Sequence, residues 1–262
     1  MTGIRRAWAL DAPTMTADES FVLTGGGSAP VVMPLPAFLV EHDLGLVLFD
    51  AGLAPEAAGD PGAVYGPLAE AFQAVFPEEF RLDRQIEGLG FRTEDVRHVV
   101  LSHAHFDHTG GLSHFPHAQG FAGAGELRYA QQPATHLAGF FRKQDLEAAA
   151  QISWNELPAG YDHDLFGDGS VTLLSLPGHT PGSLGLQLRQ DGRTLVLSGD
   201  AAHVQRNISQ TTGIPVDVDS VRALDSLRKL KLLAARPDVT VWVNHDPDDW
   251  QTHRAGGKQI LG

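Results

Sequence analysis

The segment LSHAHFDHTGG, residues 101–111, places three histidines and one aspartate within six positions. In an extended chain His103 and His105 point the same way, because side chains repeat every two residues. Asp107 and His108 follow where the preceding apolar strand has ended and the chain can turn. Imidazole nitrogens and carboxylate oxygens at this spacing are typical ligands of a divalent metal ion. The segment therefore predicts a metal site.

Three further candidate ligands follow apolar segments that are expected to be strands. They are His179 after residues 171–176, Asp200 after residues 195–198, and His245 at the end of residues 239–244. Functional groups gather at the C-terminal ends of strands in open sheets, so we expect the three to join the cluster. Five histidines and two aspartates suit two metal ions that share one carboxylate.

This ligand chemistry favours zinc, with cobalt, manganese or iron as alternatives set by availability. Two ions ~3.5–4 Å apart would hold a hydroxide between them and polarise both ends of a breaking bond. The absence of cysteine excludes both disulfides and thiolate ligands, so any metal must be held by His, Asp or Glu.

The amino-acid composition limits the classes of molecule that this protein is expected to bind. The formal net charge is −13, from 32 acidic and 19 basic residues, which disfavours nucleic acid and anionic membranes. The first residues, MTGIRRAWALDAP, contain only a short apolar run, so we expect neither a signal peptide nor a membrane span and predict a cytoplasmic protein. A small molecule is the expected partner, and a homodimer is left open.

Hydrophobic patterning predicts alternating strands and helices in a single domain, residues 1–262, without a linker. Strands are expected at residues 36–42, 44–52, 95–102, 170–178 and 239–246, with a hairpin at 183–200 and a strand passing into a helix at 119–130. Helices are expected at residues 66–76, 144–154 and 218–236, the last with Val221, Leu224, Leu227, Leu230 and Leu233 on one face. The similar segments GLVLFDAG and TLVLSGDA suggest two related halves, each contributing one sheet.

The motifs HAHFDH, GHT, SGD and the late NHD resemble those of the metallo-β-lactamase superfamily. The resemblance spans nearly the whole chain, from LPAFLVEHDLGLVLFDAG to VNHDPDD, and is greatest to the N-acyl homoserine lactonases. It implies an α/β fold, an αββα sandwich of two packed mixed sheets with helices on the outer faces. It also implies a quorum-quenching hydrolase that opens a lactone ring by attack of a metal-bridging hydroxide.

The resemblance assigns roles position by position. The first metal would be held by His103, His105 and His179, the second by Asp107, His108 and His245, and both by Asp200. Asp107 would also pass a proton to the leaving alkoxide, and Phe106 would border the acyl chain. Asp50 matches a position that supports the ligands, although a turn-stabilising role is an equal alternative.

One position departs from the family pattern. Many of these lactonases have a tyrosine three residues after the bridging aspartate, and its hydroxyl binds the lactone carbonyl. Here DAAHVQ places His203 there. Its imidazole can donate a hydrogen bond in the same role, but a different substrate or a surface histidine are alternatives. Five aromatic residues are available to line an acyl pocket: Phe72, Phe76, Phe140, Phe141 and Trp154.

Other functions use related sites. An arylesterase or phosphotriesterase would need the same ligands. A thioesterase of the glyoxalase II kind is disfavoured, since that group adds a helical domain after the last histidine and only 17 residues follow His245. A β-lactamase is disfavoured by the bridging role of Asp200 and the missing cysteine and signal peptide. A non-enzymatic metal-binding protein is disfavoured because all seven ligands are present.

Overall fold

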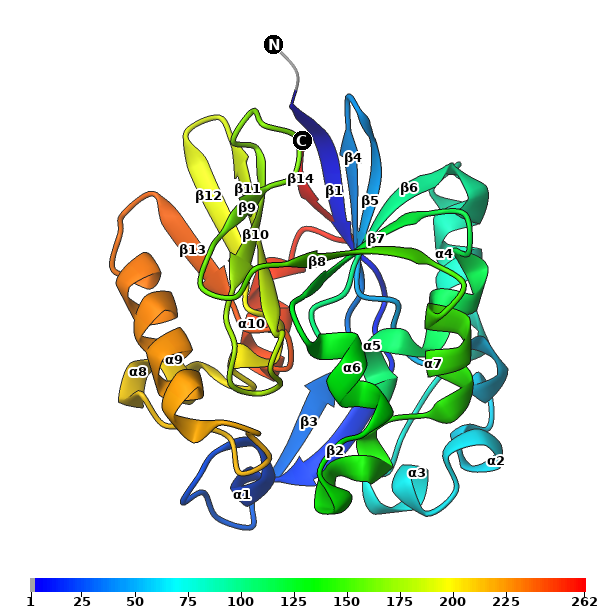
Figure 1. Cartoon of the computed structure of the whole chain (residues 1–262), viewed down its shortest axis with the longest axis vertical. Coiled ribbons are helices and arrows are strands. Elements are labelled where there is room, and N and C mark those ends of the chain that lie inside the picture. The colour runs from blue at the N-terminus through cyan, green and yellow to red at the C-terminus, as the bar shows by residue number, and fades with distance from the viewer. Residues whose placement is uncertain (1–2) are drawn as a thin grey trace.

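The structure is a computed structural model and describes residues 3–262. Two sheets face each other with helices on their outer sides (Figure 1). The strands of the seven-stranded sheet are, in spatial order, β14 (Gln259–Leu261), β1 (Ile4–Ala9), β4 (Phe38–His42), β5 (Gly45–Phe49), β6 (Val96–Val100), β7 (Gln119–Gly123) and β8 (Ser153–Leu157). The five-stranded sheet has the order β13 (Val239–Trp242), β12 (Arg193–Leu197), β11 (Leu184–Gln190), β10 (Val171–Ser175) and β9 (His163–Asp164).

Helices and a small third sheet complete the chain. The α-helices are α1 (Glu19–Val22), α2 (Pro61–Tyr65), α3 (Pro67–Ala71), α4 (Leu82–Gly88), α5 (Phe106–Thr109), α6 (Glu126–Gln131), α7 (Lys143–Ala149), α8 (Gln205–Gln210), α9 (Ser220–Ala234) and α10 (Pro247–His253). Short 3-10 helices are η1 (Pro55–Ala57), η2 (Glu78–Phe80), η3 (Thr93–Asp95), η4 (Gly110–His114), η5 (Thr135–Phe140) and η6 (Gly199–Ala201). The third sheet pairs β2 (Thr14–Asp18) with β3 (Pro30–Pro34). Within residues 3–262, no helix is both long and apolar enough to cross a membrane.

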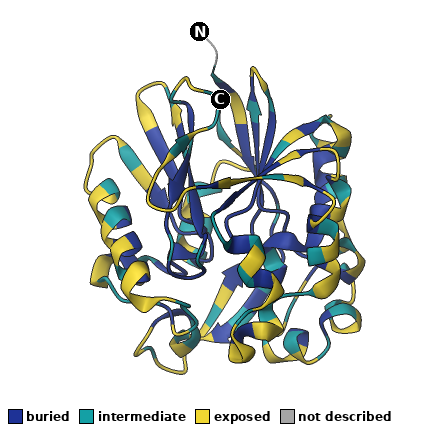
Figure 2. Cartoon of the chain, in the orientation of Figure 1, coloured by how far each residue is buried: buried dark blue, intermediate teal, exposed yellow. Residues whose placement is uncertain are grey.

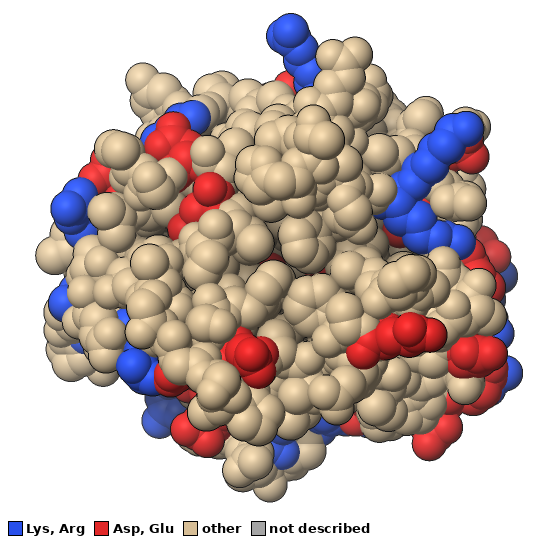
Figure 3. All heavy atoms as spheres, turned by 90° about the horizontal axis from the view of Figure 1, so that it is seen from below, with Lys and Arg blue, Asp and Glu red and all other residues tan. Residues whose placement is uncertain are grey.

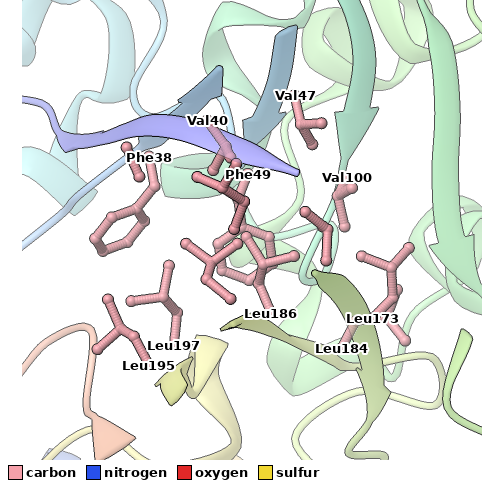
Figure 4. Packing of buried hydrophobic residues seen from close by; sticks show 14 of the residues in the cluster. Phe38, Val40, Val47, Phe49, Val100, Leu173, Leu184, Leu186, Leu195 and Leu197 are labelled. Atoms are coloured by element: carbon pink, nitrogen blue, oxygen red, sulfur yellow. The ribbon is translucent and has the colours of Figure 1, made fainter. Parts of the chain in front are cut away.

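Strand β5 shows why its sequence reads as an almost unbroken apolar run. Its residues Val47 and Phe49 pack between the two sheets, whereas Leu46 and Leu48 pack beneath the outer helices. A strand buried on both faces needs apolar side chains at odd and even positions alike. Figure 4 shows the inter-sheet layer and Figure 2 the buried strands within an exposed outer shell. The predicted αββα sandwich is confirmed.

The two sheets repeat one arrangement of strands. Strand β4 forms an antiparallel hairpin with β5, and β6 then adds in parallel. Strand β11 forms the same kind of hairpin with β12, and β13 adds in parallel. The second hairpin turns at Asp191 and Gly192, both with positive φ, as a tight two-residue hairpin turn requires. This repeated topology supports the interpretation of two related halves.

Two predicted helices are wrong at their ends. The helix expected at residues 66–76 is the shorter α3, which starts at Pro67 after Gly66 (φ +52°) and stops at Ala71, because Gln73 has φ +45° and Val75 pairs with Thr14 as an isolated bridge. The helix expected at residues 144–154 ends at Ala149, and Trp154 lies on strand β8. Apolar spacing could not separate a short helix from the strand that follows it.

The long helix α9 lies where expected, but its inner face is narrower than predicted. Leu227 and Leu230 are fully buried against the five-stranded sheet, with Leu224 and Leu233 partly buried beside them. Val221 is 69% exposed and does not belong to this face. Asp219 begins the helix by accepting hydrogen bonds from two backbone N–H groups, so Val221 lies in the first turn, beyond the sheet.

Candidate metal centre

The predicted ligands follow strands β6, β10, β12 and β13, whose ends meet at one edge of the sandwich. After β6 the chain stays extended through His105 and then forms the single turn α5. Gly110 and Gly111 follow, and a Cβ atom on Gly110 would lie 2.0 Å from the backbone nitrogen of Ala54. The paired glycines therefore let this turn pack on the segment after β5, and that packing fixes where α5 starts.

All seven predicted ligands come together in two connected groups. One group contains His103, His105 and His179, and the other contains Asp107, His108 and His245. In each group one donor atom per residue lies within 4.8 Å of the others. Asp200 joins them, with Oδ1 3.4 Å from His108 Nε2 and Oδ2 3.8 Å from both His103 Nε2 and His179 Nε2.

Several polar atoms of the predicted ligands lack hydrogen-bond partners within the described chain. The Nε2 atoms of His103 and His108, and Oδ1 of Asp200, are buried and make no hydrogen bond to any residue of 3–262, whereas His105 presents Nδ1 to the group, 3.2 Å from His179 Nε2. Buried polar atoms left unpaired are costly. A divalent ion between them would use their lone pairs, so the residues present fit such an ion in both number and chemistry.

Charge in the cluster is unevenly distributed. Burial lowers the pKa values of His103 and His105, which keeps both imidazoles neutral with free lone pairs. Burial opposes a charged His108 too, but Asp107, Asp200 and Asp50 together raise its pKa well above the ordinary value. Burial likewise opposes ionisation of Asp107, yet His108 lowers its pKa to about 2. A proton held on His108 must therefore leave when a cation binds there.

A second set of contacts orients the imidazoles. His108 Nδ1 lies 2.9 Å from Asp50 Oδ2, His245 Nδ1 lies 2.7 Å from the carbonyl oxygen of Pro34, and His179 Nδ1 lies 3.3 Å from Asp217 Oδ1. Each contact occupies Nδ1 and leaves Nε2 for the cluster, the arrangement usual around metal ligands. Asp50 also accepts a hydrogen bond from the backbone N–H of Ser102.

The sequence missed two of these orienting groups. Asp217 lies 38 residues from His179 along the chain, and the Pro34 carbonyl lies 211 residues from His245. Neither has a local signal, because a carbonyl is present at every residue and Asp217 stands among several aspartates near the start of a helix. Asp50 was identified by resemblance, and its contact with His108 favours the ligand-supporting alternative over a role confined to its own turn.

A small, mostly apolar cavity opens above the cluster. Its apolar lining consists of Met15, Phe21, Met33, Leu35, Phe72, Phe106, Phe140 and Val216, and its polar lining of His105, Asp107, His179, Asp200, His203 and His245. The lower face of the molecule is shown in Figure 3, where charged side chains lie mostly toward the rim. The cavity suits a ligand with an apolar portion and a polar end that meets the histidines.

Of the aromatic residues predicted to line a pocket, two do so and three do not. Phe72 and Phe140 line the cavity. Phe76 is buried in the core beneath it, and Phe141 packs against the His105 ring at 4.9 Å outside the cavity. Trp154 donates to the carbonyl of Ala149 on the outer side of the sheet. Phe21, Met15 and Met33, which line it as well, come from N-terminal segments that carried no functional signal.

His203 is buried, 4% exposed, and lines the cavity beside the ligands. The surface alternative is therefore wrong. Its Nε2 lies 3.1 Å from Asp200 Oδ2, and its Nδ1 has no partner within residues 3–262. The donor atoms of His179, Asp200 and His203 also lie within 4.8 Å of one another, so His203 is close enough to act with the cluster.

Residues 32–245 match the family described as the metallo-beta-lactamase superfamily. The chain belongs to this superfamily. It is 32% identical to the N-acyl homoserine lactonase AttM of Agrobacterium fabrum over 254 residues, 95% of this chain and 96% of that protein. It is 31% identical to AttM of Azorhizobium caulinodans, with 97% of both chains covered.

Solved structures with low sequence identity share the fold. An N-acyl homoserine lactone hydrolase with the product N-hexanoyl-L-homoserine bound at its catalytic metal centre superposes with a TM-score of 0.83 at 21% identity, covering 95% of this chain and 96% of that one. AidC, a dizinc quorum-quenching lactonase, gives a TM-score of 0.69 at 18% identity, covering 94% and 91%. The fold expected from the sequence is thus also found among these solved structures.

Proposed function

We propose that this protein is a metal-dependent hydrolase of ester bonds that opens the lactone ring of N-acyl homoserine lactones, and so quenches quorum sensing. The observation that carries the proposal is the joining of two metal-binding groups through Asp200 at the base of an apolar cavity. Relatives at 31–32% identity over nearly the whole chain are named N-acyl homoserine lactonases. The cavity offers apolar residues for the acyl chain and polar residues for the lactone.

The two groups of predicted ligands would each hold one divalent ion. His103, His105 and His179 would hold the first ion, Asp107, His108 and His245 would hold the second, and Asp200 would contact both. Zinc fits the nitrogen and oxygen donors, and cobalt, manganese and iron are alternatives. When bound, such ions supply a water that is activated at neutral pH and positive charge for the carbonyl and leaving oxygens.

Residues of this chain would bind the lactone and transfer a proton to its leaving oxygen. Phe106, 3% exposed and packed on Tyr65 with ring centres 5.0 Å apart, would form a rigid wall for the acyl chain. Asp107 lines the cavity with its side chain 12% exposed, so it can reach both the cluster and a substrate. We assign to Asp107 the transfer of a proton to the leaving oxygen. His203 would donate a hydrogen bond to the lactone carbonyl.

A substrate panel tests the assignment. Protein reconstituted with Zn²⁺, Co²⁺ or Mn²⁺ would be assayed on homoserine lactones of several acyl lengths, a simple γ-lactone, a chromogenic cephalosporin, a thioester and an aryl phosphotriester. The expected result is highest kcat/KM on an acyl homoserine lactone, lost on chelation, with about two ions per chain by elemental analysis. Higher kcat/KM on another substrate of the panel would overturn the lactonase assignment, and one ion or none in active protein would overturn the dinuclear site.

Three further predictions concern location, domain organisation and oligomeric state. They are the cytoplasmic location, the single domain over residues 1–262 and the homodimer as an open alternative.

A further inference from the structure

A buried carboxylate that is not one of the seven predicted ligands contacts both loops that carry His103, His105 and His179, here called the first metal group. Glu126 is the first residue of α6 and has no exposed surface. Its Oε1 accepts the backbone N–H of Ala104 at 2.8 Å, and its Oε2 accepts the hydroxyl of Thr180 at 2.6 Å and the backbone N–H of Gly182 at 2.9 Å. Ala104 lies between His103 and His105, and Thr180 follows His179.

The backbone around Glu126 is built for this close contact. Strand β7 ends at Gly123, and a Cβ atom there would lie 2.1 Å from the carbonyl oxygen of Gly182. A Cβ atom on Gly182 would lie 2.4 Å from the Gly123 oxygen and 2.7 Å from Cβ of Glu126. Gly125, the residue that precedes α6, lies in the left-handed region at φ +83°. Two loops from different sheets thus meet across a glycine pair, and the Glu126 side chain joins them.

The charge of Glu126 has no cationic side chain to balance it. Among residues 3–262, no lysine or arginine pairs with it, and its partners are two backbone N–H groups and one hydroxyl. Burial raises the pKa of this carboxyl above its ordinary value, although the three hydrogen bonds and the nearby His179 act in the opposite direction. A backbone N–H can only donate, so both oxygens are used as acceptors, as in the ionised form. An uncompensated buried carboxylate is costly unless a cation lies nearby.

The first metal group is the one that lacks a negative ligand of its own. It consists of His103, His105 and His179, whereas the second group contains Asp107. Among the seven predicted ligands of the described chain, only Asp200, shared between the groups, brings a carboxylate to the first, and Asp217 contacts its outer side through His179 Nδ1. A carboxylate that touches the residues adjacent to all three histidines would supply both geometry and charge to that group.

We propose that Glu126 is a positioning residue for the first metal ion: its carboxylate fixes the loops that carry His103, His105 and His179 and adds negative charge beside their neutral imidazoles. The inference rests on the proposed dinuclear site. Contacts to groups around metal ligands are commonly worth about 10- to 100-fold in metal affinity. We expect a loss of this size when Glu126 is replaced, confined to the first ion.

Two starting variants, each of which retains one metal site, allow the two sites to be measured separately. His245→Ala weakens the second site and leaves the first, whereas His179→Ala weakens the first and leaves the second. Glu126→Gln would be added to each, and the Kd for Co²⁺ measured by competition with a chromophoric chelator. The expected result is a 10- to 100-fold weaker Kd in the His245→Ala background and less than a 3-fold change in the His179→Ala background. The Co²⁺ absorption spectrum should change only in the former.

A milder variant covers the case in which Glu126→Gln does not fold. Thr180→Val removes the hydroxyl donor at 2.6 Å but keeps the carboxylate, and should weaken only the first ion, by less than Glu126→Gln would. The melting temperature of the metal-free protein controls for general destabilisation. Equal Kd changes in both backgrounds, or none in either, would overturn the role of Glu126. If neither background binds Co²⁺ and the parent also binds none, the dinuclear proposal itself fails, and with it this inference.

Discussion

Replacement of His203 tests the position where this chain departs from the family pattern. Burial lowers the pKa of His203, so the ring is neutral at pH 7 and carries one N–H. Its backbone is held firmly, because Asn207 Oδ1 accepts the N–H groups of both His203 and Val204. Phe21 stacks on the ring with centroids 6.4 Å apart. The imidazole is therefore held in one orientation at the cavity wall.

The size of the effect follows from that single N–H. One hydrogen bond to a lactone carbonyl that gains charge in the transition state contributes roughly 1–3 kcal/mol, or about 5- to 150-fold in kcat/KM. In the structure, Nε2 lies 3.1 Å from Asp200 Oδ2. A carboxylate oxygen can only accept, so this contact places the single N–H of the neutral ring on Nε2, and Nδ1 carries the lone pair that has no partner in residues 3–262. Donation to the lactone therefore requires this N–H to leave Asp200, which we expect when Asp200 binds the metal ions. His203→Ala should lose this factor while both metal ions are retained.

Two further variants separate the hydrogen bond from the space that the ring fills. His203→Phe keeps an aromatic ring without a donor, and it should lose about as much kcat/KM as the alanine variant. His203→Tyr restores a donor and should recover activity if donation is the only role. The assay is steady-state hydrolysis of acyl homoserine lactones, with elemental analysis of every variant.

Several outcomes would contradict this reasoning. Parent-like hydrolysis by His203→Ala would make His203 a bystander. Loss of metal from His203→Ala and His203→Phe would indicate that the ring acts on the ions and not on the lactone. If the parent hydrolyses no lactone but His203→Tyr does, the departure marks a different substrate, and the lactonase assignment fails while the metal site stands.

Three other predictions follow from the same geometry. Asp107→Asn should lower turnover by ~10²-fold or more with a smaller effect on KM, because a proton-transfer group is lost; two ions with near-normal kcat would remove Asp107 from the mechanism. Asp200→Ala should lose more metal by elemental analysis than any single histidine variant, since its oxygens face both groups; equal loss from His179→Ala would contradict this. Burial raises the pKa of Asp145 from 3.8 to about 6, so the folded state binds that proton more tightly. The free energy of unfolding should then fall by up to about 3 kcal/mol as pH rises from 4 to 7. Urea unfolding of the metal-free protein, with a chelator present, should show a smaller pH dependence for Asp145→Asn than for the parent. Identical pH profiles of the two proteins would refute this prediction.

The sequence by itself determined the expectation of a metal site built from His and Asp, and the fold class. The spacing of His103, His105, Asp107 and His108 is local, and a strand followed by a turn places such side chains together in nearly any sandwich of this kind. The unbroken apolar run of strand β5 likewise indicates that the strand is buried on both faces. These features could be predicted because each depends on residues within a few positions along the chain.

Only the tertiary structure decided which distant groups support the site. Glu126, Asp217 and the Pro34 carbonyl reach the ligand loops from elements far away in the chain, and no periodicity connects them. The same holds for the cavity, where Phe21 takes part and Trp154 does not. A buried polar group is specified by the donors that it meets after folding, so its role exists only once segments separated by tens to hundreds of residues have packed together.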